Sequence, residues 1–233
     1  MIPRLQLILD LEVVAGSGHD PVQLACAAVA GGVGAVHLRS RACPAGALLE
    51  WASRLRVALA GRALLLVNDR LDVALAAAAD GVQLPGVGLP PAAARALART
   101  WQQGAGTASH EALAGWESRT QPLLIGCSVH DAAAARMATG DGADFLLVGT
   151  VFASHSHPER APGGDTLVRA VRAATTLPLI AIGGITPVTA AHAMAAGADG
   201  VAVMRAVIEA PDPTAAAGAL SRELVSARAD ALA

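Results

Sequence analysis

Short apolar runs alternate along this chain with longer, alanine-rich stretches that have helical character. The runs lie near residues 5–9, 34–39, 63–68, 81–85, 122–127, 144–149, 178–182 and 200–204. Short runs with few polar residues are typical of strands that are buried on both faces. Their alternation with helical segments is the pattern of parallel βαβ units, so the sequence predicts eight strand–helix repeats.

Four of the apolar runs share a local echo. GVGAVHLR, AADGVQLP, GADFLLVG and GADGVAVM each bring a small or acidic residue directly before an apolar strand. Eight repeats in 233 residues fit a closed (β/α)8 TIM barrel, for which about 250 residues is usual. A doubly wound open sheet is the structural alternative, but no GxGxxG follows the first run.

The domain organisation follows from the same pattern. We expect one α/β TIM-barrel domain over residues 1–233, because no Pro/Gly linker is long enough to divide the chain. Residues 101–121 are Gly- and Ser-containing and weakly periodic. We interpret them as an insertion between the fourth helix and the fifth strand, on the side away from the expected active site.

Composition narrows the classes of function. A hydrophobic fraction of 54% with 15% charged residues is typical of a compact globule. A net charge of −2 without a basic run argues against nucleic acid, and no apolar run reaches the roughly 18 residues of a membrane span. The three cysteines lack CxxC spacing, and the N-terminus lacks the order of a signal peptide. We expect a cytoplasmic protein with a small-molecule partner, and homo-oligomer formation stays open.

Polar side chains gather where the predicted strands end, which is the active-site face of such a barrel. His37, Arg39 and Arg41 alternate at the second strand, and alternate residues share one face of a strand. They predict an anion-binding wall, although Arg41 in the loop could equally serve only solvation. Asn68 at the third strand is suited to a heterocycle edge. Asp69 is suited to a cation or an arginine, although an Asx-turn explains it nearly as well.

The seventh and eighth strands end in a pattern that favours phosphate. Gly183 and Gly184 follow the seventh strand, and Met204 and Arg205 precede a predicted helix after the eighth. Backbone N–H groups approach an anion closely where no side chain intervenes, and a helix N-terminus favours negative charge. We therefore predict phosphate binding at these four residues; a tight turn is the alternative explanation for the glycines.

A long polar loop, GTVFASHSHPERAPGGD, follows the sixth strand. We interpret it as a substrate loop with Ser154, Ser156 and His157 as binding residues. His155 and His157 form an HxH pair, but no third ligand is evident nearby, so no metal is expected there.

His130 follows the fifth strand, two positions after Ser128 and at the mouth of the predicted barrel. Histidine titrates in the physiological range and both accepts and donates protons. A packed histidine at a strand end is the alternative, but the location favours a proton-carrying role, with Ser128 orienting the ring.

Together HLRSR, IGCSVH, AIGGI and ADGVAV resemble the thiamine-phosphate synthase and thiazole tautomerase superfamily over nearly the whole chain. The resemblance implies a barrel that acts in thiamine biosynthesis. Synthases of this superfamily join a pyrimidine methyl diphosphate to a thiazole ethyl phosphate with magnesium and release pyrophosphate. Tautomerases move a proton without a cofactor and so aromatise a thiazole carboxylate phosphate.

Several positions distinguish the two branches. The chain has HxRxR where synthases have a QxRxK-like pattern, and Gly88 stands where the HLGQxD pattern has a magnesium-binding aspartate. Ser154, Ser156 and His157 replace the TxTK pattern, whose lysine lies close to the thiazole phosphate. Only the pair of residues 68–69 is synthase-like.

The resemblance therefore favours a thiazole tautomerase-like isomerase without a cofactor, in which His130 moves the proton of a phosphorylated thiazole. The first alternative is a thiamine-phosphate synthase, a transferase that holds magnesium with Asp69. The second alternative is a non-catalytic protein that binds thiazole or thiamine phosphate.

Overall fold

The computed structural model describes residues 1–105, 122–154 and 161–230. Eight parallel strands form a closed barrel in sequential order, and the last strand pairs with the first. They are β1 (Leu5–Asp10), β2 (Ala35–Arg39), β3 (Leu64–Asn68), β4 (Gly81–Leu84), β5 (Leu124–Val129), β6 (Phe145–Val148), β7 (Leu179–Ile182) and β8 (Gly200–Val203). The predicted (β/α)8 fold is confirmed, and each predicted strand end lies within two residues of the observed one.

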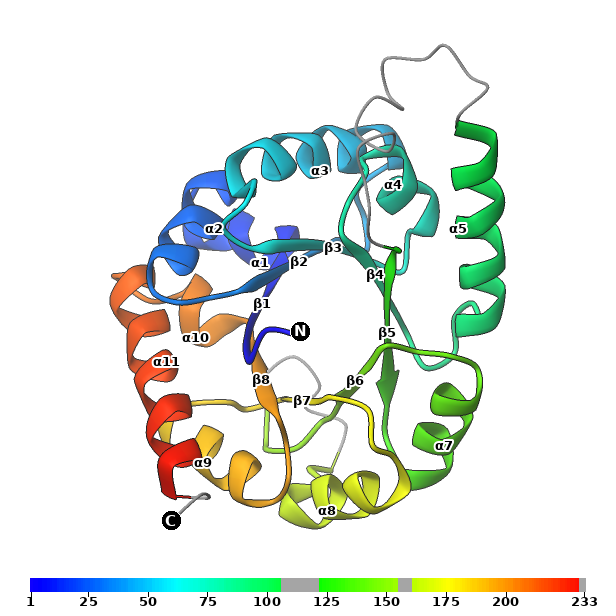
Figure 1. Cartoon of the computed structure of the whole chain (residues 1–233). Helices are drawn as coiled ribbons and strands as arrows, with labels where there is room; N and C mark the ends of the chain where they lie inside the picture. The colour runs from blue at the N-terminus through cyan, green and yellow to red at the C-terminus, as the bar shows by residue number, and fades with distance from the viewer. Residues whose placement is uncertain (106–121, 155–160, 231–233) are drawn as a thin grey trace.

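Helices surround the barrel as an outer ring (Figure 1). They are α1 (Leu11–Ser17), α2 (Pro21–Ala30), α3 (Ala45–Leu59), α4 (Leu71–Ala76), α5 (Pro91–Ala105), α7 (Ala132–Gly140), α8 (Gly164–Ala174), α9 (Pro187–Ala195), α10 (Arg205–Ile208) and α11 (Pro213–Asp230). Residues 101–105 of the predicted insertion are the last turn of α5, and residues 106–121 lie outside the described residues. In the described part of the chain, no helix combines the length and the apolar character that crossing a membrane requires.

The alternation of strand side chains divides the core into two layers. One layer packs between the strands and the helices and contains most of the buried leucines, valines and alanines. The other fills the barrel interior with residues such as Ile8, Leu66, Phe145 and Ile180. The barrel is thus a packed core, and its open functional surface is the rim where the strands end.

Three of the four echo segments form a repeated aspartate clamp at the opposite rim. Asp80, Asp144 and Asp199 directly precede β4, β6 and β8, and each carboxylate accepts a backbone N–H from the preceding strand. The donors are Leu65, Ile125 and Leu179, at 2.8, 2.7 and 2.8 Å. In return each aspartate N–H donates to the carbonyl of the same residue. Each clamp thus fixes the register between two neighbouring strands.

Candidate active site

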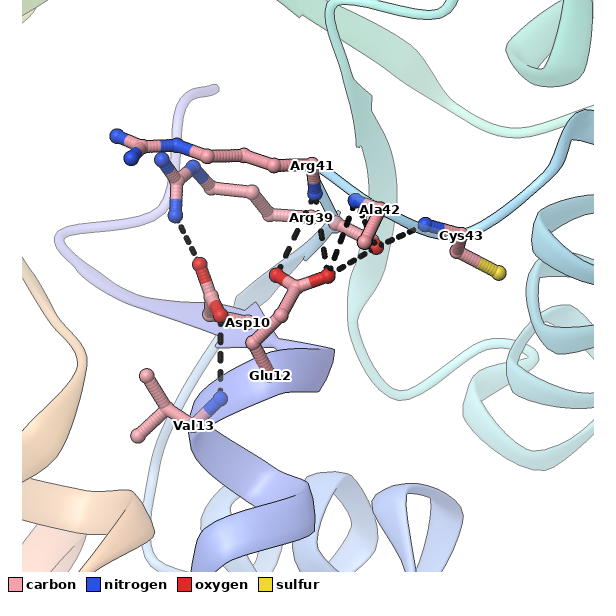
Figure 2. A network of polar contacts seen from close by, with 8 residues as sticks. Asp10, Glu12, Val13, Arg39, Arg41, Ala42 and Cys43 are labelled. Atoms are coloured by element: carbon pink, nitrogen blue, oxygen red, sulfur yellow. Dashed lines mark hydrogen bonds and ion pairs between the residues drawn. The ribbon is translucent and has the colours of Figure 1, made fainter.

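Two carboxylates and two arginines meet where β1 and β2 end (Figure 2). Asp10 is buried, pairs with the guanidinium of Arg39, and accepts the Val13 N–H at the start of α1. The Arg39 side chain remains 19% exposed, so Asp10 holds its guanidinium on one side while the other side can contact a ligand. In Figure 2 the Arg41 side chain extends in the same direction as that of Arg39. The Arg39 guanidinium pairs with a carboxylate, whereas that of Arg41 has no ion pair within the described residues and can bind an anion.

The loop after β2 is tied to α1 by Glu12. The Glu12 carboxylate accepts the Ser40 hydroxyl and the backbone N–H groups of Arg41 and Ala42. Burial raises the pKa of Glu12, but the Ser40 hydroxyl, the two N–H groups and a side-chain hydrogen bond with Asp10 together outweigh it and leave the pKa below its usual value. The carboxylate is therefore ionised while it holds the loop.

His37 requires a correction of place. It does not lie beside Arg39 at the mouth of the barrel. It lies two residues earlier on β2, opposite Ile8 of β1, and is fully buried inside the barrel. Its Nε2 lies 2.7 Å from Oε1 of Gln6, whose amide N–H donates to the Pro3 carbonyl. That bond turns the Gln6 oxygen toward His37, so Nε2 carries the hydrogen. Burial lowers the pKa of His37 to about 3, and the ring is neutral near pH 7.

Gln83 is a polar residue of this region that the sequence analysis missed. It lies on β4 one residue before the strand ends and pairs there with Gly126 of β5. Its side chain is 1% exposed and donates from Nε2 to the Ser128 hydroxyl at 3.0 Å. Because the Ser128 oxygen accepts this bond, its own hydrogen is directed elsewhere and is able to reach a ligand. The available signal was the echo, in which Gln83 occupies the same place as His37.

His130 is exposed at the end of β5, and its ring is oriented by the neighbouring strand. Nδ1 donates to the carbonyl of Gly149, directly after β6. A carbonyl only accepts, so the hydrogen of the neutral ring lies on Nδ1. Nε2 is then the acceptor that the ring offers to a substrate.

Asp69 follows β3 in the left-handed region, with φ of 64°, and its N–H donates to the Gln83 carbonyl at 2.8 Å. A non-glycine residue held there costs about 1–3 kcal/mol, and such strain gathers at functional sites. The exposed carboxylate makes no hydrogen bond or ion pair to any residue that the structure describes. Asn68 beside it is half-buried.

A metal site at this rim has few protein donors. Among residues 1–105, 122–154 and 161–230, no three His, Cys, Asp or Glu side chains gather to hold a metal. Gly88 lies in an exposed turn and donates to the Pro85 carbonyl at 3.0 Å, and a Cβ there would lie 2.7 Å from the proline Cγ. One carboxylate, that of Asp69, fits a magnesium ion that brings most of its oxygen ligands with a bound diphosphate, since magnesium commonly combines one carboxylate with substrate phosphates.

Gly183 and Gly184 follow β7 with φ of 104° and 62°, which side chains rarely adopt. The loop after β6 lies directly against them. A Cβ at Gly183 would meet Thr150 Cγ2 at 2.6 Å, and one at Gly184 would meet the Ala153 carbonyl at 2.4 Å. Both positions therefore require glycine, and both present backbone to whatever binds there.

The neighbouring strand β8 leads into α10, whose N-cap residue is Met204. No side chain of the described residues caps the N-terminus of this helix. The Arg205 guanidinium pairs with Glu209, the residue that follows α10, so Arg205 presents its backbone N–H at the rim. Ser154, in the loop after β6, is half-buried. Ser156 and His157, predicted to bind substrate, lie outside the described residues.

Comparison with known proteins places this geometry among enzymes of thiamine biosynthesis. The sequence model of the family described as thiamine monophosphate synthase matches residues 5–121 and 112–207. The thiamine-phosphate synthase of Methanoculleus marisnigri is 40% identical over 227 residues, 95% of this chain and 98% of its own. That of Moorella thermoacetica is 38% identical over 229 residues, 97% and 99% of the two chains. The solved thiamine phosphate pyrophosphorylase from Pyrococcus furiosus superposes with a TM-score of 0.79 at 29% identity, covering 96% of each chain.

These similarities overturn the thiazole tautomerase interpretation. The full-length relatives at about 40% identity are named for the synthase, which was the alternative. The local arguments that favoured the isomerase rested on His37, Gly88, Ser154, Ser156 and His157. His37 packs inside the barrel, Gly88 lies in an exposed turn, and Ser156 and His157 fall outside the described residues.

Proposed function

Because the chain belongs to the thiamine monophosphate synthase family, we propose that it is a thiamine-phosphate synthase, a transferase that couples a pyrimidine methyl diphosphate to a thiazole phosphate. The observation that carries the proposal is the 40% identity over 95% of this chain to a protein of that name. The paired arginines at the rim support it, since one of the two substrates carries a diphosphate.

The bond changes of this reaction determine what the protein has to supply. The bond between the pyrimidine methylene carbon and the diphosphate oxygen breaks, and its electron pair leaves with pyrophosphate. The lone pair of the thiazole nitrogen forms the new carbon–nitrogen bond. No proton moves in this exchange, so the acid–base role expected for His130 has no step to serve. In this proposal His130 is a binding residue that accepts a hydrogen bond at Nε2.

The diphosphate subsite is assigned to the rim of β2, β3 and β5. Arg39 and Arg41 stabilise the charge that grows on the leaving pyrophosphate, and the Ser128 hydroxyl donates to a phosphate oxygen. Asn68 contacts the pyrimidine edge. A magnesium ion, when bound, neutralises diphosphate charge, and Asp69 is the residue that would hold it.

The thiazole phosphate subsite is assigned to the rim of β7 and β8. Backbone N–H groups of Gly183, Gly184, Met204 and Arg205 would bind the phosphate, and Ser154 in the adjoining loop would contact the substrate. The two subsites face one another across the mouth of the barrel, which supports in-line approach of the thiazole nitrogen to the methylene carbon.

The test is a coupling assay with both substrates and magnesium, in which thiamine phosphate is oxidised to fluorescent thiochrome. Product is expected only when both substrates are present, and chelation of magnesium should suppress it. The synthase of Moorella thermoacetica serves as the working control. If that control forms product and this protein forms none, the proposed activity is wrong.

A further inference from the structure

Two carboxylates at the start of α1 serve the two rim arginines in different ways. Asp10 contacts the guanidinium of Arg39 directly. Glu12 does not touch a guanidinium; it binds the backbone of the loop that carries Arg41 (Figure 2). The two acids lie two residues apart at the junction of β1 and α1, so this junction positions both arginines of β2 and its loop.

The Glu12 carboxylate binds several groups of the loop formed by residues 40–43. Its carboxylate lies 3.2 and 3.3 Å from the Arg41 nitrogen, 3.3 Å from the Ala42 nitrogen, and accepts the Ser40 hydroxyl. The Ser40 oxygen in turn accepts the N–H of Cys43 at 2.8 Å. Glu12 and Ser40 thus satisfy three consecutive backbone N–H groups, and the course of residues 40–43 depends on one carboxylate.

These hydrogen bonds fix the backbone of Arg41, from which its side chain extends. Arg41 is exposed, and its guanidinium has no ion pair with a carboxylate in the part of the chain that the structure describes. A long, exposed side chain is ordered at a cost when it binds, and a fixed backbone lowers that cost. The loop contacts of Glu12 therefore prepare Arg41 for an anion without neutralising it.

We propose that Glu12 is a positioning residue for the diphosphate subsite and acts through the backbone of residues 40–43 on Arg41. The inference rests on the proposed function, because it takes the diphosphate of the substrate as the anion. It assigns a specific role in anion binding to an acidic residue, which by charge alone should repel the ligand.

The sign of the effect separates positioning from plain electrostatics. If Glu12 acted only by its charge, removing that charge would leave the rim more positive and would strengthen pyrophosphate binding. If Glu12 positions Arg41, removing it loosens the loop and weakens binding. The two mechanisms predict opposite changes for the same nearly isosteric substitution, Glu12→Gln.

The first experiment is calorimetric titration of the full chain with inorganic pyrophosphate in the presence of magnesium. We expect Glu12→Gln to bind pyrophosphate about tenfold more weakly, the size expected when one long side chain must be ordered on binding. Glu50→Gln, on the exposed surface of α3, removes the same charge without touching the loop and should bind as the wild type does. Circular dichroism spectra and melting temperatures confirm that all variants are folded.

A double-mutant cycle then tests whether Glu12 acts through Arg41. Arg41→Ala should weaken pyrophosphate binding, and adding Glu12→Gln to it should weaken binding no further, because effects on one route are not additive. In steady-state kinetics, Glu12→Gln should raise KM for the pyrimidine diphosphate about tenfold. KM for the thiazole phosphate should stay within about twofold, which a general loss of structure would not achieve.

The outcomes also separate this inference from the proposed function. Wild-type protein that fails to bind pyrophosphate would remove the diphosphate subsite and the inference with it. Wild-type protein that binds pyrophosphate, beside a Glu12→Gln variant that binds equally or more tightly, would overturn the role of Glu12 alone. Additive effects of the two substitutions would likewise show that Glu12 does not act through Arg41.

Discussion

The burial of His37 predicts an acid sensitivity that one substitution should remove. The ring is fully buried, and its pKa is lowered from 6.5 to about 3 by that burial. Below pH 6.5 the unfolded chain binds a proton at His37 while the folded chain does not. Stability from this residue is therefore present above pH 6.5 and is lost as the pH falls toward 3.

The size of the effect follows from the same two pKa values. Each pH unit in this window costs about 1.4 kcal/mol, so the folded state should lose about 2 kcal/mol between pH 6.5 and pH 5 through His37. Glutamine does not titrate, has a similar length, and can keep the N–H donation to Gln6. The free energy of unfolding of His37→Gln should thus fall less with acid than that of the wild type, by about 2 kcal/mol at pH 5.

The assay is urea unfolding followed by tryptophan fluorescence at pH 7, 6 and 5. Differences between proteins at one pH cancel the other titrating groups, which both chains share. His192→Gln provides the matched control, because it removes an exposed histidine of α9 and leaves the buried ring of His37 in place. Parallel pH profiles for the wild type and His37→Gln would refute the reasoning and would mean that His37 is protonated inside the folded barrel.

Three further predictions follow from the rim. Gly184→Ala should lower the free energy of unfolding by about 1–3 kcal/mol and raise KM for the thiazole phosphate, because φ is 62° and the added Cβ meets the Ala153 carbonyl. Urea unfolding measures the first effect, and initial rates measure the second. Asp69→Gly should raise the free energy of unfolding by about 1 kcal/mol by relieving a left-handed backbone, yet shift the magnesium dependence of the rate to higher concentration. His130→Ala should keep turnover within about tenfold of wild type, whereas loss of a true acid–base group costs roughly 10²–10⁴-fold in kcat.

The strands could be predicted from the sequence because burial on both faces leaves an unambiguous apolar run. The position of a residue along the barrel axis could not be predicted from the sequence. His37 has the parity of Arg39, as expected, but its depth depends on how β2 is registered against β1, which the pattern of one strand does not contain. The same limit concealed Gln83, whose role depends on its contact with Ser128, 45 residues away.

The motif positions favour the wrong branch of the superfamily for a related reason. Not every motif position contacts substrate: His37, for example, contacts Gln6 and Phe145 in the core. Glu12 was not singled out at all, because an acid on a first helical turn is ordinary in sequence terms. Its partners, residues 40–42, become visible only when β1 and β2 are side by side.

The aspartate clamps bear on the order in which the barrel assembles. The clamp of Asp80 on Leu65 joins residues only 15 apart in the chain, and those of Asp144 and Asp199 span 19 and 20 residues. Closing the barrel joins β1 to β8, for example Leu5 to Val201, across nearly the whole chain. Because short loops close at lower entropic cost, we expect the three clamped strand pairs to form first and the β1–β8 seam last. Asp10, which ends β1 and pairs with Arg39 of the diphosphate subsite, would then lie on a strand that completes its pairing last.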